Sequence, residues 1–406
     1  MFFKKSTPSS LGSTRDSSFA YLPADTGYFD SACQTMRPQC VIDAERDYYL
    51  HTNACGGRVK YRWGMEVDQK VQEARSLLLD MVKKTSSEYA VAFTLNTTYG
   101  INLVLHQLPV AAFDAVVTSD IEHNSVFLPT LSWAQKNGKK RLVLSRAEDG
   151  SLLYDPKDLT RSIVIINTMS NIDGRTPGNL QDLARDVHRA GGILLLDAAQ
   201  GFAHDVELLR GVDFDAAFGS GHKMYGPSIG FIILKRSLLD TLEPFFIGGG
   251  TVTDVTTDAY TLLRTGEEAH SVLEMGLQNW AGIIGLRAAM QWLKEYAPAD
   301  QSRKQYEDSL SEALFAGMQH LPRLSLLTAR PSPIVSFSVD GLDAHRLALY
   351  LDEQKILCRS GYFCCHSYLV HQRKLPPLLR VSLGLHNTLD DVQRLCDVLK
   401  HILSSL

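Results

Sequence analysis

The sequence predicts an α/β protein whose larger part is a mostly parallel sheet flanked by helices. Short apolar runs recur through the middle of the chain, each bounded by glycine or polar residues, as is typical of buried parallel strands. Helical stretches separate several of these runs, which is the strand–helix–strand repetition of α/β proteins. Polar clusters follow the runs, where such sheets place their ligands. The runs span 89–93, 115–118, 163–166, 193–196, 216–218 and 229–234.

Composition narrows the classes of function. The 406 residues suffice for two or three domains with a substantial core. A net charge of -4 argues against nucleic acid and anionic membranes as partners. No apolar stretch approaches the roughly 20 residues that span a bilayer. Seven scattered cysteines do not resemble a disulfide framework, so a cytoplasmic location is expected.

The chain divides into four predicted parts. Its first residues are rich in Ser and Thr and lack the apolar core of a secretory signal. A disordered tail explains them better than a transit peptide. The polar break at 296–300 separates a large domain from a smaller one. The predicted parts are a disordered tail (1–20), a segment joining the small domain (21–46), a large domain (47–297) and a small C-terminal domain (298–406).

Apolar spacing predicts the helices of the large domain. Apolar residues recur at intervals of three or four across 67–81, which is a helical core face. Leucines after the turn at 96–102 indicate a second helix, and 180–190 returns the chain to the run at 193–196. A long helix over 282–295 closes this domain.

The remainder of the chain has the pattern of a small α+β unit. A helix is expected over 303–321, a strand over 334–339, a helix over 344–354 and a terminal helix over 389–403. No internal repeat is present in the sequence.

A lysine and an aspartate follow two of the predicted strands. Asp197 ends one apolar run, and Lys223 lies in the glycine-rich turn 220–227. Pyridoxal phosphate needs such a pair, because a lysine binds its aldehyde and a carboxylate keeps its pyridine nitrogen protonated. Either residue alone is explained as a strand cap or a turn lysine. Together with Gln200, Ser220 and His222 they favour a cofactor site.

Leu196-Asp197-Ala198-Ala199-Gln200, followed by the motif Ser220 to Pro227, resembles the class V aminotransferase family of pyridoxal phosphate enzymes. Within that family the chain is most similar to the SufS-like (group II) cysteine desulfurases and selenocysteine lyases. The resemblance runs from about Tyr28 to the final helix. It implies a type I pyridoxal-phosphate transferase fold, a small α+β C-terminal domain and a homodimer.

The resemblance also implies how the cofactor, pyridoxal 5'-phosphate, is held. Hydroxyls at a helix N-terminus form an anion site for its phosphate, although a plain helix cap would use the same threonines. His123 is expected to stack on the ring, opposite the face that the lysine attacks. Asn171 is expected near the phenolic oxygen or the substrate carboxylate. The implied cofactor-binding residues are Thr97, Thr98, His123, Asn171, Asp197, Gln200, Ser220, His222 and Lys223.

One position departs from the family pattern. The stretch 274–279 stands where the family has Glu-x-Gly-Thr-x-Asn, and Leu277 replaces the threonine that reaches the phosphate of the partner subunit. A cross-subunit contact is therefore expected to be missing, with greater reliance on the threonines and on Ser220 and His222.

The loop 356–366 predicts the sub-function. Its Arg359-x-Gly361-x-x-Cys364 pattern resembles that of SufS-like desulfurases, in which the cysteine takes sulfur from the substrate. A thiolate is the competent nucleophile, and Arg359 and His366 are candidates to stabilise it. Arg380 is expected to grip the substrate carboxylate bidentately. Adjacent residues of an extended loop point apart, so only one of Cys364 and Cys365 is expected to face the cofactor.

Three other interpretations of this loop stay open. In the first, the adjacent residues Cys364 and Cys365 are small apolar residues buried in the core. A zinc site would use Cys358, Cys364, Cys365 and His366, but their spacing fits none of the usual structural sites, and no metal is expected. A third interpretation is a loop that keeps its shape without activity, because Tyr362-Phe363 replaces residues that are commonly polar in the family.

The sequence thus predicts a pyridoxal-phosphate-dependent cysteine desulfurase that converts L-cysteine, or selenocysteine, to alanine and leaves the sulfur as a persulfide on Cys364. Lys223 and His123 complete the predicted catalytic set, and Arg359, Arg380 and Asn171 the substrate set. Sulfur mobilisation for iron–sulfur cluster assembly would follow, with a sulfur-acceptor protein as partner. The alternatives are another class V lyase or aminotransferase and a non-catalytic sulfur-handling scaffold.

Overall fold

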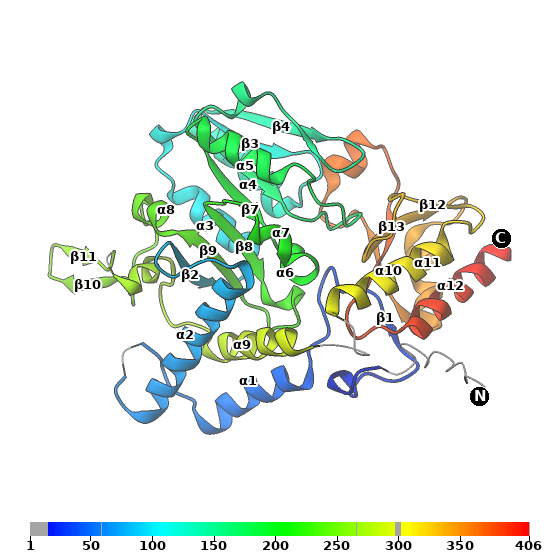
Figure 1. The fold of residues 1–406 in the computed structure, drawn as a ribbon, viewed down its shortest axis with the longest axis horizontal. Helices are drawn as coiled ribbons and strands as arrows, with labels where there is room; N and C mark the ends of the chain where they lie inside the picture. Colours follow the sequence, from blue (N-terminus) through cyan, green and yellow to red (C-terminus); the bar gives the residue numbers. More distant parts are fainter. Residues whose placement is uncertain (1–14, 58, 265, 297–301, 406) are drawn as a thin grey trace, which may run out of the picture.

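The computed structural model describes residues 15–57, 59–264, 266–296 and 302–405, which form a larger and a smaller part (Figure 1). The larger part is built on a central sheet with helices on both faces. The smaller part contains the C-terminal quarter of the chain and also receives the N-terminal strand. This organisation matches the predicted large α/β domain and small α+β domain.

Among the described residues, eight strands form the central sheet, in the order β2-β9-β8-β7-β6-β3-β4-β5. Strands β8, β7, β6, β3 and β4 are parallel, whereas β9 is antiparallel to both of its neighbours. The predicted mostly parallel sheet is confirmed. The strands are β2 (Tyr89–Thr94), β3 (Ala115–Ser119), β4 (Lys140–Arg146), β5 (Leu152–Leu153), β6 (Ser162–Asn167), β7 (Ile193–Asp197), β8 (Ala216–Ser220) and β9 (Gly230–Lys235).

Both faces of the sheet are covered by apolar cores. Successive side chains of a strand point to opposite faces, so Ile165 and Leu195 join one core while Ile166 and Leu196 join the other. The first core is completed by α3 (Thr97–Gln107), α4 (Asn124–Asn137) and α8 (Arg236–Thr241). The second core is completed by α2 (Arg62–Val82), α5 (Leu180–Arg189), α7 (Val206–Arg210) and α9 (Trp280–Glu295). Burial on both faces explains the continuous apolar runs of the sequence.

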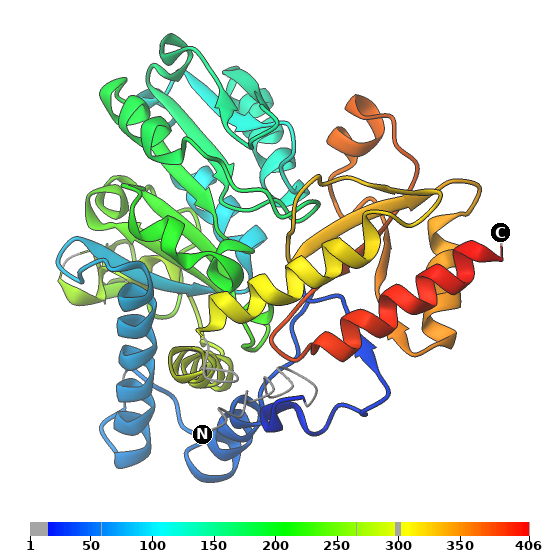
Figure 2. The same ribbon diagram turned by 45° about the vertical axis from the view of Figure 1, so that its right-hand side comes forward.

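The smaller part has an antiparallel sheet of order β12-β13-β16-β15. Its long helices α10 (Arg303–Met318) and α12 (Leu389–Ser404) lie side by side (Figure 2). The other elements are β12 (Leu324–Leu326), β13 (Ile334–Val339), α11 (Ala344–Glu353), β14 (Ile356–Leu357), β15 (Arg359–Gly361), the π-helix η7 (Ser367–Gln372) and β16 (Leu378–Ser382).

The N-terminal segment is shared between the two parts. Strand β1 (Gly27–Tyr28) pairs in parallel with β14 of the small part. Helix α1 (Gln39–His51), by contrast, packs against α9 of the large part. The predicted domain boundary at residue 46 therefore falls inside a helix.

The predicted disordered tail of residues 1–20 is wrong for residues 15–20, and residues 1–14 lie outside the described part of the chain. The Arg15 guanidinium donates to the carbonyls of His386 and Thr26 and pairs with Asp391. Phe19 is fully buried, with its ring 5.6 Å from that of Trp292. Apart from Thr26, these partners are distant in sequence, so no local pattern around residue 15 indicates them.

Short elements complete the description. They are η1 (Ser17–Phe19), η2 (Val110–Ala112), η3 (Pro156–Leu159), α6 (Gly201–His204), η4 (Gly221–Lys223), β10 (Val252–Val255), β11 (Tyr260–Leu262) and η5 (Glu267–Leu273). None of the helices in the described ranges has both the length and the apolar content needed to cross a membrane.

Candidate active site

A cavity of about 250 Å³ lies at the carboxyl ends of the parallel strands, facing the small part. Strands β6, β7 and β8 end there in Asn167, Asp197 and Ser220. This edge is where open α/β sheets bind ligands. The cavity is lined by Ala32, Cys33, Asn96, Thr97, Thr98, His123, Ser125, Asn167, Met169, Asn171, Asp197, Ala199, Gln200, Ser220, His222, Lys223, Arg359, Phe363, Cys364 and Arg380. All the site residues predicted from the sequence are among them.

Lys223 and Asp197 meet in this cavity. Burial lowers the pKa of Lys223, and the positive charge of Arg380 lowers it further, while Asp197 opposes both. Burial raises the pKa of Asp197, against the opposing effects of Lys223 and of the hydrogen bond from the Ala199 N–H at 3.0 Å. The environment thus favours the neutral amine, which is the nucleophilic form of a lysine.

The turn that presents Lys223 is rigid. The Gly221 N–H donates to the Ile229 carbonyl at 2.7 Å, and the Gly226 N–H donates to the Gly221 carbonyl at 2.8 Å. A Cβ atom on Gly221 would lie 2.6 Å from the Pro227 carbonyl oxygen, so the close backbone approach requires glycine. The glycine-rich motif of the sequence therefore fixes where the lysine stands.

Hydroxyl groups gather at the N-terminus of α3. The hydroxyls of Thr97 and Ser220 lie 2.7 Å apart, and those of Thr98 and Ser125 lie 2.5 Å apart. Asn96 caps the helix by accepting a hydrogen bond from the Tyr99 N–H at 2.9 Å. Hydroxyls beside a helix N-terminus form an anion site. Ser125 was not predicted, because only the fold brings it to Thr98.

His123 caps α4 and lines the cavity. Its Nδ1 accepts the Ser125 N–H at 3.1 Å and lies 2.8 Å from the Ser125 hydroxyl. Burial lowers the pKa of His123 to about 3, aided by the charges of Lys223 and Arg380. Burial and Lys223 also lower the pKa of His222 to about 4. Both rings are therefore neutral at physiological pH.

Glu122 anchors the loop that carries His123, a role that the sequence analysis missed. Its buried carboxylate accepts from the Ser119 hydroxyl at 2.6 Å and from the Asn167 N–H at 3.0 Å. It also pairs with Arg146 at 3.2 Å. The sequence does show a glutamate next to the histidine that is predicted to stack on the ring. The partners of this glutamate, however, come from the ends of three different strands, which only the fold brings together.

Two arginines form a cationic corner of the cavity. Arg359 on β15 and Arg380 on β16 are direct cross-strand partners. Arg380 is fully buried, and its NH2 pairs with Asp30 Oδ1 at 2.9 Å. Arg359 instead donates from NH1 to Cys33 Sγ at 2.9 Å. Like charges directly opposite one another repel, so this corner favours an anion between them.

The loop after β15 places the two adjacent cysteines differently. Cys364 lines the cavity, whereas Cys365 is 1% exposed, and its Sγ donates to Asn171 Oδ1 at 3.3 Å. Burial raises the pKa of Cys365 well above its ordinary value. Phe363 (φ 48°) and Cys364 (φ 59°) adopt the left-handed region. Two hydrogen bonds hold them there, from Asn171 Nδ2 to the Phe363 carbonyl and from the Asn124 N–H to the Cys364 carbonyl.

Three predicted side chains make contacts other than those expected. The amide of Asn171 is engaged with the cysteine loop through both of its polar atoms. Arg359 contacts Cys33, a thiol that the sequence analysis did not single out. His366 is exposed, and its ring lies 5.3 Å from that of Tyr362.

Two buried polar atoms on the cavity wall lack a hydrogen-bond partner among the described residues. They are Oε1 of Gln200 and Nε of Arg380. The other end of the Gln200 amide is fixed, because Nε2 donates to the Ala32 carbonyl at 2.7 Å. Unpaired buried polar atoms are costly, so a ligand that pairs with them gains binding free energy.

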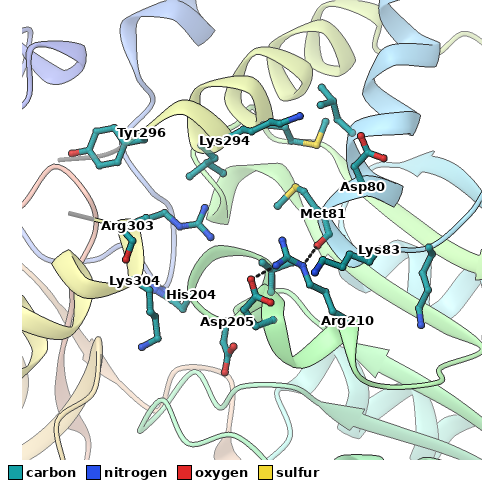
Figure 3. Close-up of a pocket in the computed structure, with 17 residues that line it drawn as sticks. Asp80, Met81, Lys83, His204, Asp205, Arg210, Lys294, Tyr296, Arg303 and Lys304 are labelled. Atoms are coloured by element: carbon teal, nitrogen blue, oxygen red, sulfur yellow. Dashed lines mark hydrogen bonds and ion pairs between the residues drawn. The ribbon is translucent and has the colours of Figure 1, made fainter. Parts of the chain in front are cut away.

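A second, larger cavity of about 880 Å³ lies away from this site, between the ends of α2, α7, α9 and α10 (Figure 3). Arg210 at its edge is held by the Met81 carbonyl and by Glu207, and Lys304 pairs with Asp308. None of the predicted site residues lines it. In the described residues no three His, Cys, Asp or Glu side chains are arranged to bind a metal ion.

Comparisons with known proteins agree with this geometry. The family model described as aminotransferase class-V matches residues 27–395. A probable cysteine desulfurase from Methanothermobacter thermautotrophicus is 31% identical over 93% of this chain and 95% of its own. A probable cysteine desulfurase from Pyrococcus abyssi is 32% identical over 93% of this chain and 94% of its own.

Solved structures share the fold. The apo structure of a cysteine desulfurase from Thermococcus onnurineus NA1 superimposes with a TM-score of 0.84, at 28% identity over 94% of this chain and 96% of its own. A cysteine desulfurase from Escherichia coli superimposes with a TM-score of 0.82, at 28% identity over 96% of this chain and 97% of its own.

Proposed function

Because the chain belongs to the aminotransferase class-V family, we propose that it is a pyridoxal-phosphate-dependent cysteine desulfurase. One observation carries the proposal, namely that Lys223, Asp197 and Cys364 line the same small cavity. A lysine and a buried carboxylate suit the cofactor, and a half-buried thiol suits a sulfur acceptor. The curated relatives named cysteine desulfurase support the same activity.

The residues of the cavity fit pyridoxal phosphate. The hydroxyls of Thr97, Thr98 and Ser220 at the N-terminus of α3 suit a phosphate. Asp197 suits a protonated ring nitrogen, and the unpartnered Oε1 of Gln200 at the same wall is available to accept a hydrogen bond from a bound ligand. When bound, this group supplies an electron sink for the substrate's α-carbon.

Different residues of the chain have different roles in the reaction. Arg380 and Arg359 receive the substrate carboxylate, since they form the cationic corner. Lys223 has a lowered pKa and moves the α-proton as a neutral amine. Cys364 takes the substrate sulfur and becomes a persulfide, while the remainder of the substrate leaves as alanine. His123 contributes a neutral ring on the cavity wall.

We assign the chain to the SufS-like group within this family, with L-cysteine, or selenocysteine, as the substrate. The Arg359-x-Gly361-x-x-Cys364 register supports that assignment. Tyr362 and Phe363 differ from the usual polar residues there, and Phe363 is buried with its ring 4.8 Å from the Arg380 guanidinium. In this chain Phe363 therefore has a packing role.

A homodimer is the proposed assembly. Apolar side chains at 245–247 and at Leu277 are largely exposed, and the two segments are joined by a hydrogen bond from the Gly276 N–H to the Gly249 carbonyl at 2.7 Å. Exposed apolar groups of this kind are typical of interaction surfaces. We expect the protein to act in the cytoplasm and to pass sulfur to an acceptor protein that serves iron–sulfur cluster assembly.

The purified protein with L-cysteine tests the proposal directly. We expect a visible absorption band from the bound cofactor, and equal amounts of alanine and protein-bound or released sulfur. Lys223→Ala should lose both the band and the alanine. Pyruvate or an amino-transfer product without sulfane sulfur would indicate another class V activity instead. A colourless protein that releases neither product would indicate a non-catalytic scaffold.

A further inference from the structure

Cys33 is a second thiol on the wall of the candidate active site. It lies in the turn after β1, whereas Cys364 lies in the loop after β15, and both are half-buried and line the same cavity of about 250 Å³. Two neighbouring cysteines are unsuited to sulfur transfer, because burial raises the pKa of Cys365 strongly and that of Cys358 to about 12. The two cavity-lining thiols are thus distinguished from the other cysteines of this region.

The contact between Cys33 and Arg359 parallels an ion pair next to it. Arg380 NH2 pairs with the Asp30 carboxylate at 2.9 Å, and Arg359 NH1 lies at the same distance from Cys33 Sγ. One turn of the chain therefore supplies an acceptor to each of the two cross-strand arginines. The Arg359 guanidinium therefore holds the sulfur of Cys33 at the cavity wall, next to the Arg380–Asp30 pair.

The backbone holds Cys33 firmly in place. The preceding residue, Ala32, donates its N–H to the Ser382 hydroxyl at 2.9 Å and accepts from Gln200 at 2.7 Å. The Cys33 N–H donates to the Asp30 carbonyl at 3.0 Å. Arg380 Nε and Gln200 Oε1, both buried and unpartnered among the described residues, line the same wall. Cys33 therefore shares this wall with two polar atoms that are available to a ligand.

We propose that Cys33 is a second sulfur-carrying thiol of this site, which takes the sulfane sulfur from the Cys364 persulfide. The inference rests on the proposed desulfurase function. The Cys33 thiolate attacks the outer sulfur of the persulfide, and a new S–S bond forms at Cys33. The bond between that sulfur and Cys364 Sγ breaks, and Cys364 leaves as a thiolate. The proton stays with the transferred sulfur, so the exchange needs no oxidant or reductant.

Time-resolved peptide mapping of the holoenzyme tests the transfer. The protein is mixed with L-cysteine, quenched by alkylation at intervals, and each cysteine is analysed by mass spectrometry. We expect the additional sulfur on Cys364 first and on Cys33 later. In Cys33→Ser the sulfur should remain on Cys364, and in Cys364→Ser neither site should carry it. Cys40→Ser, at an exposed cysteine outside the cavity, is the matched control and should behave as the parent.

The outcomes separate this inference from the proposed function. Sulfur on Cys364 with none on Cys33 throughout the time course overturns the transfer and leaves the desulfurase intact. Sulfur on Cys33 in Cys364→Ser shows direct attack on the substrate and also overturns the transfer. Absence of alanine and of sulfur from both cysteines refutes the desulfurase function, and the inference with it.

Alkylation without substrate gives a readout that does not depend on turnover. At pH 7, Arg359→Gln should change the rate of iodoacetamide labelling of Cys33, because the contact that holds its sulfur at the cavity wall is removed. Arg373→Gln, at an arginine that does not line the cavity, is the matched control. Equal labelling rates in the parent and in Arg359→Gln would refute the role assigned to the guanidinium.

Discussion

Cys364 and Cys365 are adjacent in the sequence, but the side chains around them differ, and so does their chemistry. Cys364 lines the cavity, while Cys365 is buried and hydrogen-bonded to Asn171. Burial disfavours a thiolate at Cys365, as its raised pKa indicates. A difference of one position in the sequence therefore separates a candidate nucleophile from a packing residue.

The first prediction compares the two cysteines. Cys364→Ala should keep the visible band of the cofactor, since no cofactor contact is assigned to its thiol, but should fail to accumulate protein-bound sulfur. Cys365→Ala should accumulate sulfur like the parent and lose only packing within the loop. Mass spectrometry after incubation with L-cysteine measures both. Sulfur on Cys365 in the Cys364→Ala protein, at the parent's rate, would show that the assigned register is off by one residue.

The second prediction concerns Asp197, whose buried carboxylate is proposed to pair with the ring nitrogen of the cofactor. Asp197→Asn keeps the size of the side chain and removes its charge. We expect the cofactor to remain bound and turnover to fall about 10²–10³-fold, the cost typical of one preorganised electrostatic contact. Steady-state kinetics with L-cysteine, together with the visible spectrum, measures both quantities. Turnover near the parent's would assign the ring nitrogen to another residue.

Whole elements set the positions of these side chains. The parallel strands β6, β7 and β8 end at one edge, so that Asp197 and Lys223 meet although two short helices and a strand separate them in sequence. The turn η4 then depends on a close approach between the backbones of Gly221 and Pro227. Such an approach is available to glycine alone.

The third prediction tests this turn. Gly221→Ala would place a methyl group 2.6 Å from the Pro227 carbonyl oxygen, so the turn must shift and carry Lys223 with it. We expect weaker cofactor retention and lower turnover, because the lysine leaves its productive geometry. Gly248→Ala is the control, since its Cβ would meet nothing within 4 Å. Titration of the apoprotein with pyridoxal phosphate measures the affinity, and identical curves for the two variants would contradict the assignment.

On the scale of the whole molecule, the N-terminal segment packs against the small part at His386. The His386 ring is fully buried, lies 5.7 Å from the ring of Phe19, and contacts the Tyr28 carbonyl through Nε2 at 3.0 Å. Burial lowers its pKa to about 4, aided by the charge of Arg15, while the Tyr28 carbonyl opposes the shift. The native state therefore holds this histidine neutral.

The fourth prediction follows from that pKa. Below the ordinary histidine value of 6.5, the unfolded chain binds a proton at this position that the native state does not bind, so stability falls as the pH drops from 6.5 towards 4. The shift corresponds to at most about 3 kcal/mol from this residue. Chemical denaturation at pH 7 and pH 4.5 measures the loss.

A variant isolates the contribution of His386 from that of other titrating groups. His386→Gln should be less stable than the parent at pH 7 but should lose less stability between pH 7 and pH 4.5. The buried carboxyls Glu122 and Asp197 have raised pKa values and act in the opposite direction, but they do so equally in both proteins. Equal losses in the parent and the variant would show that His386 is protonated in the native state.

Some elements could be predicted from the local sequence pattern, whereas others depend on contacts with residues that are distant in the sequence. The strands at the centre of the sheet were predictable, because burial on both faces leaves a continuous apolar run. Strand β4 was not predicted, since it is partly exposed and only three apolar residues stand between its charged and polar ends. Strand β16, which carries Arg380, was missed as well. The fully buried charge of Arg380 interrupts the apolar pattern, and its compensation by Asp30 comes from 350 residues away.

The sequence by itself indicated the sheet class and the candidate residues Lys223, Asp197 and Cys364, because each stands in a short segment with a recognisable pattern. Only the tertiary structure decided which groups meet across the cavity. It placed Arg359 on Cys33, 326 residues away, engaged Asn171 with the cysteine loop, and packed residues 15–20 into the fold. Side-chain pairing at such separations is set by how sheets and helices pack, and that packing leaves no local trace in either partner's segment.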